Sequence, residues 1–253
     1  MNKKQKITLI TGANRGMGFA MAKEIGKNGH HILLGARNIE SGEKAVGILK
    51  ELNIDADFIQ LDVSNHNSVL QAVETIKQEY GYLSVLINNA GISLDNFRTP
   101  TQLDLDTIRK DFEVNFFGLI DVTQTMLPLL EQSNEAKIIN ISSVMGSLIA
   151  ATSIDSPLYN ASAAGYQSSK AAVNMYTIKL AKELSERTGS LITVNAIDPG
   201  MVATDFGGGT AEDAKKRGAK SIEEGIARAV ELAISDGDNT TGTFSNTDGI
   251  VAW

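Results

Sequence analysis

Two side chains capable of acid–base chemistry stand four residues apart in the stretch AAGYQSSKAAV, residues 163–173. They are Tyr166 and Lys170. Residues four apart on a helix share one face, so the lysine ammonium would act on the same space as the phenol. An ordinary phenol has a pKa of about 10, too high for fast proton delivery near neutrality, and a nearby cation lowers that pKa. The pair is a candidate proton donor, and helix packing is the alternative explanation of the same spacing.

Two serines stand where a substrate oxygen could be held. The stretch NISSVMG (140–146) places Ser142 and Ser143 at the carboxyl end of an apolar run, ahead of the helix that bears Tyr166. A serine hydroxyl there could hydrogen-bond a carbonyl oxygen and orient it. The alternative is that both serines simply end the strand.

A glycine-rich turn supplies a candidate phosphate cradle. In TGANRGMGFAMA (11–22), Gly12, Gly16 and Gly18 follow a short apolar run and open a helical pattern. Glycines let the backbone turn sharply and approach a pyrophosphate, while the helix N-terminus offers N–H donors. The pattern indicates a dinucleotide site, with a structural turn that binds no ligand as the alternative.

Two arginines favour NADP(H) over NAD(H). Dinucleotide sites that hold a ribose 2′-hydroxyl carry an acid about 20 residues after the glycines. Here the second apolar run ends at Arg37, and no acid occurs before Glu40. Arg15 lies inside the glycine turn, and two converging guanidiniums would suit a 2′-phosphate. Either arginine could instead only solvate a loop.

Two further strand ends could border the cofactor. Asp62 and Val63 close the third apolar run, where a carboxylate and a backbone amide could meet the adenine, although Asp62 could equally cap the helix beginning after Ser64. The stretch NNAG (88–91) ends the fourth run with two amides and small residues. It allows close approach of a cofactor, while Asn88 and Asn89 are also expected to stabilise the strand edge.

The elements that must position these residues alternate between short strands and amphipathic helices. This alternation predicts an α/β fold with a doubly wound, parallel, seven-stranded sheet and helices on both faces, whose ligands bind at the carboxyl ends of the strands. The predicted strands lie at 6–12, 30–37, 56–63, 84–91, 137–143, 191–200 and 241–249, and helical patterns lie at 19–29, 42–53, 68–81 and 171–189.

The bulk composition limits the classes of function. We expect one domain over 1–253, with 1–140 mainly binding the dinucleotide and 141–253 mainly catalytic and substrate-binding. The net charge of -7 opposes nonspecific binding to nucleic acid or anionic membranes. No cysteine and three scattered histidines supply neither a thiolate nor a metal-ligand set. No apolar run approaches the roughly 20 residues that span a bilayer, so we expect a soluble protein, and the absence of cysteine favours a cytoplasmic one.

Six motifs together resemble one family, the short-chain dehydrogenase/reductases. They occur in the family's order over essentially the whole chain: TGANRGMG, NNAG, VNFFG, ISSVMG, YQSSK and DPGMVATD. The resemblance implies a Rossmann-type fold and a catalytic set of Asn115, Ser143, Tyr166 and Lys170. The second serine of the pair is usually the catalytic one, so Ser142 is the lesser choice.

The resemblance also implies a role for each of these residues. Tyr166 would protonate the carbonyl oxygen as hydride arrives from the nicotinamide, and Ser143 would hold that oxygen. Lys170 would lower the pKa of the tyrosine and bind the nicotinamide ribose. Asn115 would bind a water that links Lys170 to solvent.

The cofactor contacts that the resemblance implies extend along the whole carboxyl edge. The segment PGMVATD would reach the nicotinamide carboxamide through the Val202 backbone and the Thr204 hydroxyl. The full expected set is Gly12, Asn14, Arg15, Gly16, Met17, Gly18, Arg37, Asp62, Val63, Asn89, Ala90, Gly91, Tyr166, Lys170, Pro199, Gly200, Val202 and Thr204.

One region departs from the simple members of the family. The 23 positions from Ser143 to Tyr166 exceed the usual spacing, and the extra residues lie within 147–165. Carbonyl reductases of the family carry insertions here and use NADPH, which agrees with the two arginines. Tyr159, with Ala163 four residues on, lacks a cation and is expected to be pocket wall or surface. A homodimer or homotetramer is expected, although such insertions can block the packing.

We therefore expect reversible NADPH-dependent reduction of a ketone or aldehyde to an alcohol, as in carbonyl reductases and alcohol dehydrogenases (EC 1.1.1.-). One alternative is an NADP(H)-binding redox sensor with little turnover. Another is an enzyme restricted to one metabolic carbonyl, such as a steroid, a sugar or an acyl-carrier thioester. The segment from Met201 to about Ser221, with its glycine cluster at 207–209, is a candidate mobile lid or an ordinary surface loop.

Overall fold

A computed structural model describes residues 4–187 and 191–253. Its centre is one sheet, in which the first seven strands are parallel and the last runs antiparallel to its neighbour. The spatial order is β3 (Ala56–Gln60), β2 (His31–Ala36), β1 (Ile7–Thr11), β4 (Val85–Asn88), β5 (Glu135–Ile141), β6 (Leu191–Ile197), β7 (Phe244–Asn246) and β8 (Gly249–Ile250). The predicted doubly wound α/β sheet is confirmed.

The sheet has eight strands in the described chain, one more than the seven predicted. The apolar pattern at 241–249 contains a tight turn, in which Asn246 Oδ1 accepts a hydrogen bond from the Asp248 N–H at 2.8 Å. Gly249 follows with a φ of 127°, a conformation that glycine adopts readily. The turn folds the chain back, so a short hairpin replaces the single strand that the pattern predicts.

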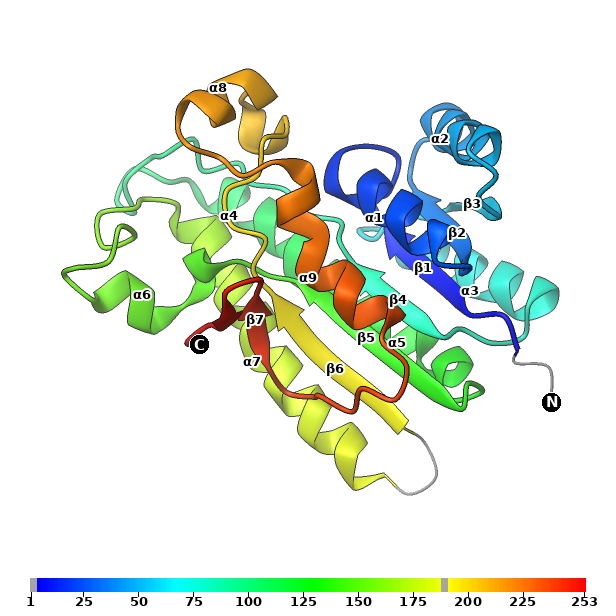
Figure 1. The fold of residues 1–253 in the computed structure, drawn as a ribbon. Coiled ribbons are helices and arrows are strands. Elements are labelled where there is room, and N and C mark those ends of the chain that lie inside the picture. Colours follow the sequence, from blue (N-terminus) through cyan, green and yellow to red (C-terminus); the bar gives the residue numbers. More distant parts are fainter. Residues whose placement is uncertain (1–3, 188–190) are drawn as a thin grey trace.

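Helices cover both faces of the sheet (Figure 1). One apolar layer is formed with α1 (Gly16–Lys27), α2 (Ile39–Glu51) and α9 (Ile222–Ile234), and the other with α3 (His66–Glu79), α5 (Gly118–Leu130) and α7 (Ala164–Glu186). The helical pattern predicted to 189 is described as far as Glu186, and its last residues, 188 and 189, lie outside the described residues.

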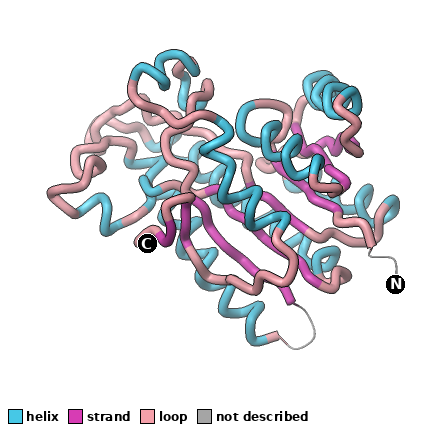
Figure 2. The backbone as a smooth tube through the Cα atoms, in the orientation of Figure 1, coloured by secondary structure: helices cyan, strands magenta, loops and turns pink. Residues whose placement is uncertain are grey.

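Shorter helical elements gather at the carboxyl edge, among the long loops (Figure 2). They are α4 (Leu105–Phe112), a π-helical turn (Glu113–Phe117), a 3-10 turn (Val144–Gly146), α6 (Leu148–Thr152), a second 3-10 turn (Phe206–Gly208) and α8 (Ala211–Lys216). The strand order reverses between β1 and β4, and a crevice outside this switch point is where open α/β sheets bind ligands.

Burial on both faces explains why the strands are nearly continuous apolar runs. Every residue of β1 and β2 is buried, and neighbouring side chains such as Leu9 and Ile10 enter opposite layers. Burying one such aliphatic side chain contributes about 1.5–3 kcal/mol. The sheet is therefore a rigid base, and the polar groups that act on a ligand lie beyond the strand ends.

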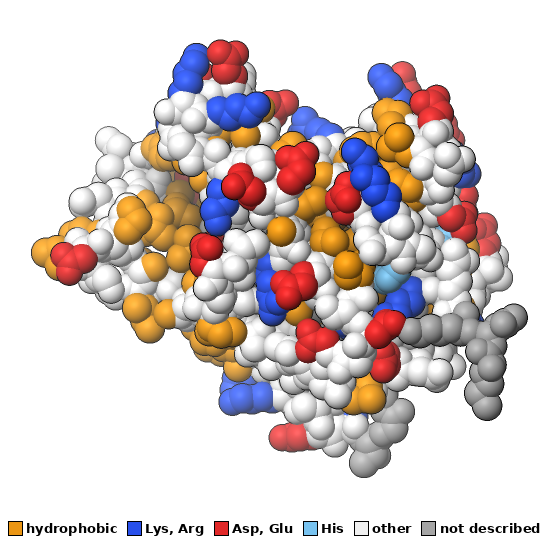
Figure 3. Space-filling model, in the orientation of Figure 1, with side chains coloured by type: hydrophobic (Ala, Val, Ile, Leu, Met, Phe, Trp, Pro, Cys, Tyr) orange, Lys and Arg blue, Asp and Glu red, His pale blue; other side chains and the backbone are white. Residues whose placement is uncertain are grey.

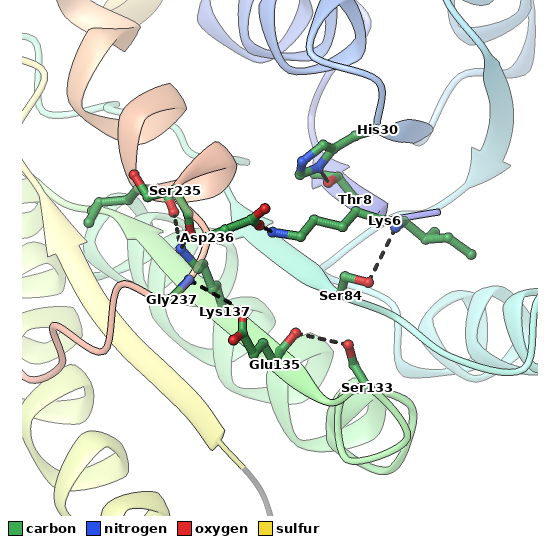
Figure 4. A network of polar contacts seen from close by, with 12 residues as sticks. Lys6, Thr8, His30, Ser84, Ser133, Glu135, Lys137, Ser235, Asp236 and Gly237 are labelled. Atoms are coloured by element: carbon green, nitrogen blue, oxygen red, sulfur yellow. Dashed lines mark hydrogen bonds and ion pairs between the residues drawn. The ribbon is translucent and has the colours of Figure 1, made fainter. Parts of the chain in front are cut away.

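A buried lysine near the start of β5, Lys137, links the C-terminal end of α9 to the sheet at the edge away from the strands' carboxyl ends (Figure 4). Lys137 on β5 is 6% exposed, and its Nζ donates to Leu232 O at 2.7 Å and to Ser235 O. Burial lowers the pKa of Lys137. The ammonium satisfies carbonyls that the end of a helix leaves without partners, where a positive charge is also favoured by the helix dipole.

Replacing this lysine should destabilise the fold. Lys137→Met keeps much of the apolar stem but leaves the two carbonyls without this donor, so we expect the free energy of unfolding to fall by about 1–3 kcal/mol. Urea denaturation measures it. Lys50→Met, which removes an exposed ion pair with Asp57, is the matched control and should change the same free energy by less than about 1 kcal/mol. Equal losses in both variants would contradict a special role for Lys137.

Candidate active site

The start of α7 brings Tyr166 and Lys170 to the carboxyl edge of the sheet. Lys170 is 4% exposed, and its Nζ donates to Ile141 O at 2.7 Å, at the end of β5. The same nitrogen lies 5.7 Å from the centre of the Tyr166 ring. Burial lowers the pKa of Lys170 to about 8. The two side chains therefore share one space, as the four-residue spacing predicts.

The pKa of the Tyr166 phenol is raised in the structure, whereas the sequence predicted that Lys170 would lower it. Burial raises the pKa of Tyr166 above its ordinary value, a hydrogen bond with Ser143 acts in the opposite direction, and the charges of Asp198 and Asp111 raise it further. Lys170 donates to a backbone carbonyl, and it is not among the groups that shift the pKa of Tyr166. The protein's own groups thus keep the phenol protonated near neutrality, instead of lowering its pKa as the sequence suggested.

The two serines point to different partners. Ser142 Oγ is buried and donates to Asn174 Oδ1 of α7 at 2.5 Å, so it joins the strand to the helix. Ser143 Oγ accepts the Met145 N–H at 3.2 Å and hydrogen-bonds Tyr166. Ser143 therefore faces the phenol, while Ser142 faces the protein interior.

Asn115 makes hydrogen bonds to the backbone of Ile92 and to the side chain of Ser169. It lies in the π-helical turn between α4 and α5, where its Nδ2 donates to Ile92 O at 2.8 Å and its Oδ1 accepts the Ile92 N–H at 2.8 Å. Its Nδ2 also donates to Ser169 Oγ at 3.0 Å. Both amide hydrogens are thus used, and the side chain fixes the loop after β4 against α7.

The glycine turn is packed tightly against the end of β4. A Cβ on Gly18 would lie 2.6 Å from Asn89 Nδ2 and 2.7 Å from Gly12 O, and Gly12 itself has a φ of 64°. Asn89 Nδ2 donates to Thr11 O at 2.8 Å, while Asn88 Nδ2 donates to Thr123 Oγ1. Both asparagines therefore hold the strand ends.

The N-terminus of α1 fits a phosphate. Its N-cap residue, Arg15, makes no side-chain cap, whereas the N-cap residues of α2, α3, α4, α8 and α9 all do. Gly16 has a φ of 57°, and only Thr204 Cγ2, at 3.8 Å, would meet a Cβ built there. Glycines that leave room beside uncapped N–H donors suit a pyrophosphate. Asn14 braces the turn by donating to Ser41 Oγ at 3.1 Å.

The end of β2 borders a cavity of about 320 Å³ lined by Arg37, Gln60, Asp62, Asn65, Asn67, Ser68 and Gln71. Arg15 is exposed and does not line it. Asp62 Oδ1 accepts from the N–H and Oγ of Ser64, and the N-cap of α3 is Asn65. The alternative that Asp62 caps this helix is therefore wrong.

The segment after β6 covers the tyrosine. Pro199 is buried, and Gly200, with a φ of 72°, donates its N–H to Asp198 Oδ1 at 3.2 Å. The chain then reaches Val202 and Thr204, and Phe206 places its ring 5.8 Å from that of Tyr166. At the base of the segment, the Ala203 N–H donates to Lys220 O at 2.9 Å, and the Lys220 N–H donates to Met201 O at 2.8 Å. The two ends of the candidate lid are thus tied to each other by backbone hydrogen bonds.

The remaining predicted cofactor residues lie beside these groups. Met17 packs on the apolar layer below α1, and Val63 is buried with its carbonyl 2.6 Å from the position a Cβ on Gly118 would take. The Ala90 N–H donates to Thr11 Oγ1 at 2.9 Å. A Cβ on Gly91 would lie 3.8 Å from Lys170 Nζ, so this glycine lies where strand β4 meets the lysine.

The insertion at 147–165 forms α6 and a loop at the rim of the site. It exposes Leu148, Ile149, Ile154 and Tyr159, and Figure 3 shows apolar side chains gathered at this end of the molecule. Tyr159 is 47% exposed, which agrees with a surface role and not with an acid in the site. Ser162 Oγ donates to Arg98 O at 2.8 Å and ties the insertion to the loop after β4.

Sequence reasoning missed three residues that touch the tyrosine or its helix: Asp95, Asp111 and Phe206. Asp95 accepts the Tyr166 N–H, and Asp111 adds to the negative potential at Tyr166. Acidic residues are ordinarily exposed, so nothing in the local pattern marks these two as buried. For Phe206, a large aromatic directly before three glycines was a usable signal.

Among the described residues, no group of acids and histidines could hold a metal ion, and no helix has the length and apolarity to cross a membrane.

Comparison with known proteins gives a consistent match. The family model described as short chain dehydrogenase covers residues 6–215. The short-chain dehydrogenase anuI of Penicillium roqueforti is 37% identical over 240 residues, covering 91% of this chain and 89% of its own, and carbonyl reductase [NADPH] 1 of Mus musculus is 30% identical, covering all of both chains. The crystal structure of NADPH-bound carbonyl reductase from chicken fatty liver superposes with a TM-score of 0.84 at 25% identity, covering 99% of this chain and 100% of that one.

Adding a methyl group at Gly18 tests whether the glycine turn binds the cofactor. In Gly18→Ala the added methyl would meet backbone and Asn89, so we expect NADPH binding to be abolished or weakened at least about 10-fold and stability to fall by about 1–3 kcal/mol. Calorimetric titration and thermal unfolding measure the two effects. Gly47→Ala on α2, where a Cβ meets nothing within 4 Å, is the control and should instead stabilise by about 0.5–1 kcal/mol. Unchanged NADPH affinity in Gly18→Ala would exclude the turn as the cofactor site.

Proposed function

The chain belongs to the short-chain dehydrogenase family, and on this premise we propose that it reduces a ketone or aldehyde to an alcohol with NADPH, reversibly. The observation that carries the proposal is the position of buried Lys170, whose Nζ lies 5.7 Å from the centre of the Tyr166 ring, with buried Ser143 acting on the same phenol. These three groups supply an oxygen clamp, a proton and a cation in one place.

In the proposed reaction, Ser143 Oγ donates a hydrogen bond to the carbonyl oxygen of the substrate. A nicotinamide cofactor held along the carboxyl edge would supply the hydride for the carbonyl carbon. Tyr166 gives its proton to the oxygen, so that one hydride and one proton complete the alcohol. Because burial raises the pKa of Tyr166, the phenol is protonated at neutral pH and ready for the reductive direction. Lys170 would hold the nicotinamide ribose, and Asn115 keeps the adjoining loop in place.

The preference for NADP(H) is supported by Arg37. Its side chain is exposed at the end of β2 and lines the cavity where the adenosine ribose would lie. A guanidinium can grip a phosphate with paired, charge-assisted hydrogen bonds. Arg15, at the N-cap of α1, is a second candidate for the same phosphate.

We propose an apolar or aromatic substrate for the site. Phe206 packs on Tyr166, and the insertion adds exposed apolar side chains at the rim, among them Leu148 and Ile149. A neutral carbonyl compound with an aliphatic or aromatic body would gain from this burial. We further propose that 1–140 mainly bind the cofactor and 141–253 the substrate, and that 201–221 move as a lid.

We further propose that the protein is cytoplasmic, that it forms a homodimer or homotetramer, and that it binds neither nucleic acid nor membranes. Light scattering of the purified protein tests the assembly.

Loss of the phenol should stop turnover. With a panel of ketones and aldehydes, Tyr166→Phe should lower kcat by about 10²–10⁴, because the proton donor is gone. Ser143→Ala should also lower kcat, whereas Ser142→Ala should retain turnover and instead lose about 1–3 kcal/mol of stability through the unpaired Asn174. The change in NADPH absorbance during the reaction measures the rates. A fully active Phe variant would sink the mechanism, and tight NADPH binding without turnover on any carbonyl would favour a redox sensor.

Reversing the charge at the ribose site should change the cofactor preference. Arg37→Asp should weaken NADPH relative to NADH by about 10- to 100-fold in kcat/KM, because a charged hydrogen bond of about 1.5–3 kcal/mol is lost and an acid can hold the 2′-hydroxyl. Arg15→Ala reports whether the second arginine contributes. The control is Arg109→Ala, an exposed residue paired with Asp106, which should leave the preference unchanged. An unshifted preference in Arg37→Asp would remove Arg37 from cofactor selection.

A further inference from the structure

The helix that carries Tyr166 is capped by a residue from a different part of the chain. Ala163, the N-cap residue of α7, has no side-chain acceptor. Asp95, in the loop after β4, fills this role: its Oδ1 accepts the Gly165 N–H at 2.8 Å, and its Oδ2 accepts the Tyr166 N–H at 2.9 Å. Asp95 is 0% exposed. Both carboxylate oxygens are thus bound to the first turn of the helix, one of them to the backbone of the tyrosine itself.

A second acid is buried against the first. Asp111 on α4 is 0% exposed, and its Oδ1 accepts the Leu94 N–H at 3.1 Å. Its Oδ2 is buried and receives no hydrogen bond from any described donor. A Cβ on Gly165 would lie 3.1 Å from Asp111 Oδ2 and 3.2 Å from Asp95 Oδ1, so the two carboxyl groups converge on this glycine. Two carboxylates placed together in a buried site cannot both be ionised without strong repulsion.

We propose that Asp95 and Asp111 share one proton and together position Tyr166, with Asp95 holding the first turn of α7 and Asp111 bracing Asp95. The inference rests on the proposed function only in treating Tyr166 as the proton donor. The negative charge is better placed on Asp95, because two N–H donors and the positive end of the helix dipole face it. Asp111 then carries the proton, and its otherwise unpartnered Oδ2 becomes a donor to Asp95.

The charged neighbours favour a single negative charge. Arg98 lies beside Asp95, where its Nε donates to the Asp95 carbonyl at 3.2 Å, but its NH1 is paired with Asp104 at 2.8 Å. Its NH2 reaches Leu94 O and Thr107 Oγ1 instead of a carboxylate of the pair. No described cation therefore pairs with the carboxyl of Asp111.

The other charged groups near the phenol are Asp198, which adds negative potential to it, and Lys170, which donates to the end of β5. Burial and the neighbouring Asp95 raise the pKa of Asp111 to about 7. Above that pH, a second negative charge would appear below Tyr166. It would repel Asp95 and make the phenol a weaker acid.

The pH profile distinguishes a shared proton from a plain structural contact. In the wild type, kcat for reduction should fall as pH rises past about 7, because Asp111 loses its proton. Asp111→Asn can still donate to Asp95 but cannot ionise, so it should keep kcat within about 5-fold at pH 6 and lose this decline. The same decline in the wild type and in Asp111→Asn would overturn the proposal.

The cap itself is tested by Asp95→Asn, whose single acceptor oxygen cannot serve both N–H groups. We expect kcat to fall about 10²-fold with KM for NADPH unchanged, since a small displacement of a catalytic group has an effect of this size. Asp106→Ala, which removes an exposed acid from the first turn of α4 and leaves the pair of Arg98 with Asp104 intact, is the matched control and should lower thermal stability slightly without moving the pH profile. A profile shifted as much by Asp106→Ala as by Asp111→Asn would assign the effect to packing of α4 and overturn the proposal.

A measurement without turnover separates this proposal from the proposed function. In protein labelled with ¹³C at the tyrosine Cζ, the Tyr166 signal, assigned with Tyr166→Phe, should shift between about pH 6 and 8 in the wild type and not in Asp111→Asn. This outcome would stand even if no carbonyl were reduced. A Tyr166 signal that is constant with pH in both proteins would refute the shared proton whatever the enzyme does.

The dependence of thermal stability on pH is a second test of whether Asp111 titrates. A carboxyl whose pKa is raised by folding contributes fully below its unfolded pKa of about 4, and this contribution is lost as pH rises toward about 7. The difference in Tm between Asp111→Asn and the wild type should therefore grow in favour of the variant from about pH 4 to about pH 7 and stay constant above that. A constant difference in Tm would contradict titration of Asp111.

Discussion

Burial of the sheet on both faces is the constraint on which the rest of the structure depends. Because the strands are covered by two layers of helices, polar side chains that act on a ligand must stand beyond the strand ends. At the switch point, the Thr11 hydroxyl accepts the N–H groups of Asn89 and Ala90 at 3.0 and 2.9 Å and so joins β1 to β4. This junction keeps the glycine turn and the end of β4 in register. The glycine turn that opens α1 and the loop after β4 both start from it.

Much of the fold could be predicted from the sequence, because its signals are local. Apolar runs of strand length alternate with helical periodicity, and glycines stand where β1 turns into α1, so layers, strand direction and the binding edge follow. The eighth strand escaped because Phe244–Asn246 and Gly249–Ile250 share one apolar stretch, and only the turn between them separates two strands. Such a turn depends on a hydrogen bond to Asn246 that a pattern of hydrophobicity does not contain.

Part of the candidate site could likewise be predicted from local sequence signals, and part could not. Tyr166, Lys170 and Ser143 were found because helical spacing and strand ends place them, and the structure does bring them together. The environment of the phenol could not be found, since burial and two distant acids act on it through tertiary contacts. Asp95 is 71 positions from Tyr166, and no local signal links them. Asn115 likewise has a role that depends on where Ile92 lies, which only the folded chain specifies.

The fastening of Met201 and Val202 to Lys220 has a consequence for how this protein can diversify. Because both ends of the segment are tied to each other by backbone hydrogen bonds, changes in the residues between them need not disturb β6 or α9. The entropy of closing a loop grows only slowly with its length, so insertions and deletions there are tolerated well. The segment that covers Tyr166 can therefore vary in sequence and length independently of the rest of the fold. Selection can alter which molecules reach the tyrosine while the sheet, the glycine turn and the helix that carries Tyr166 stay as they are.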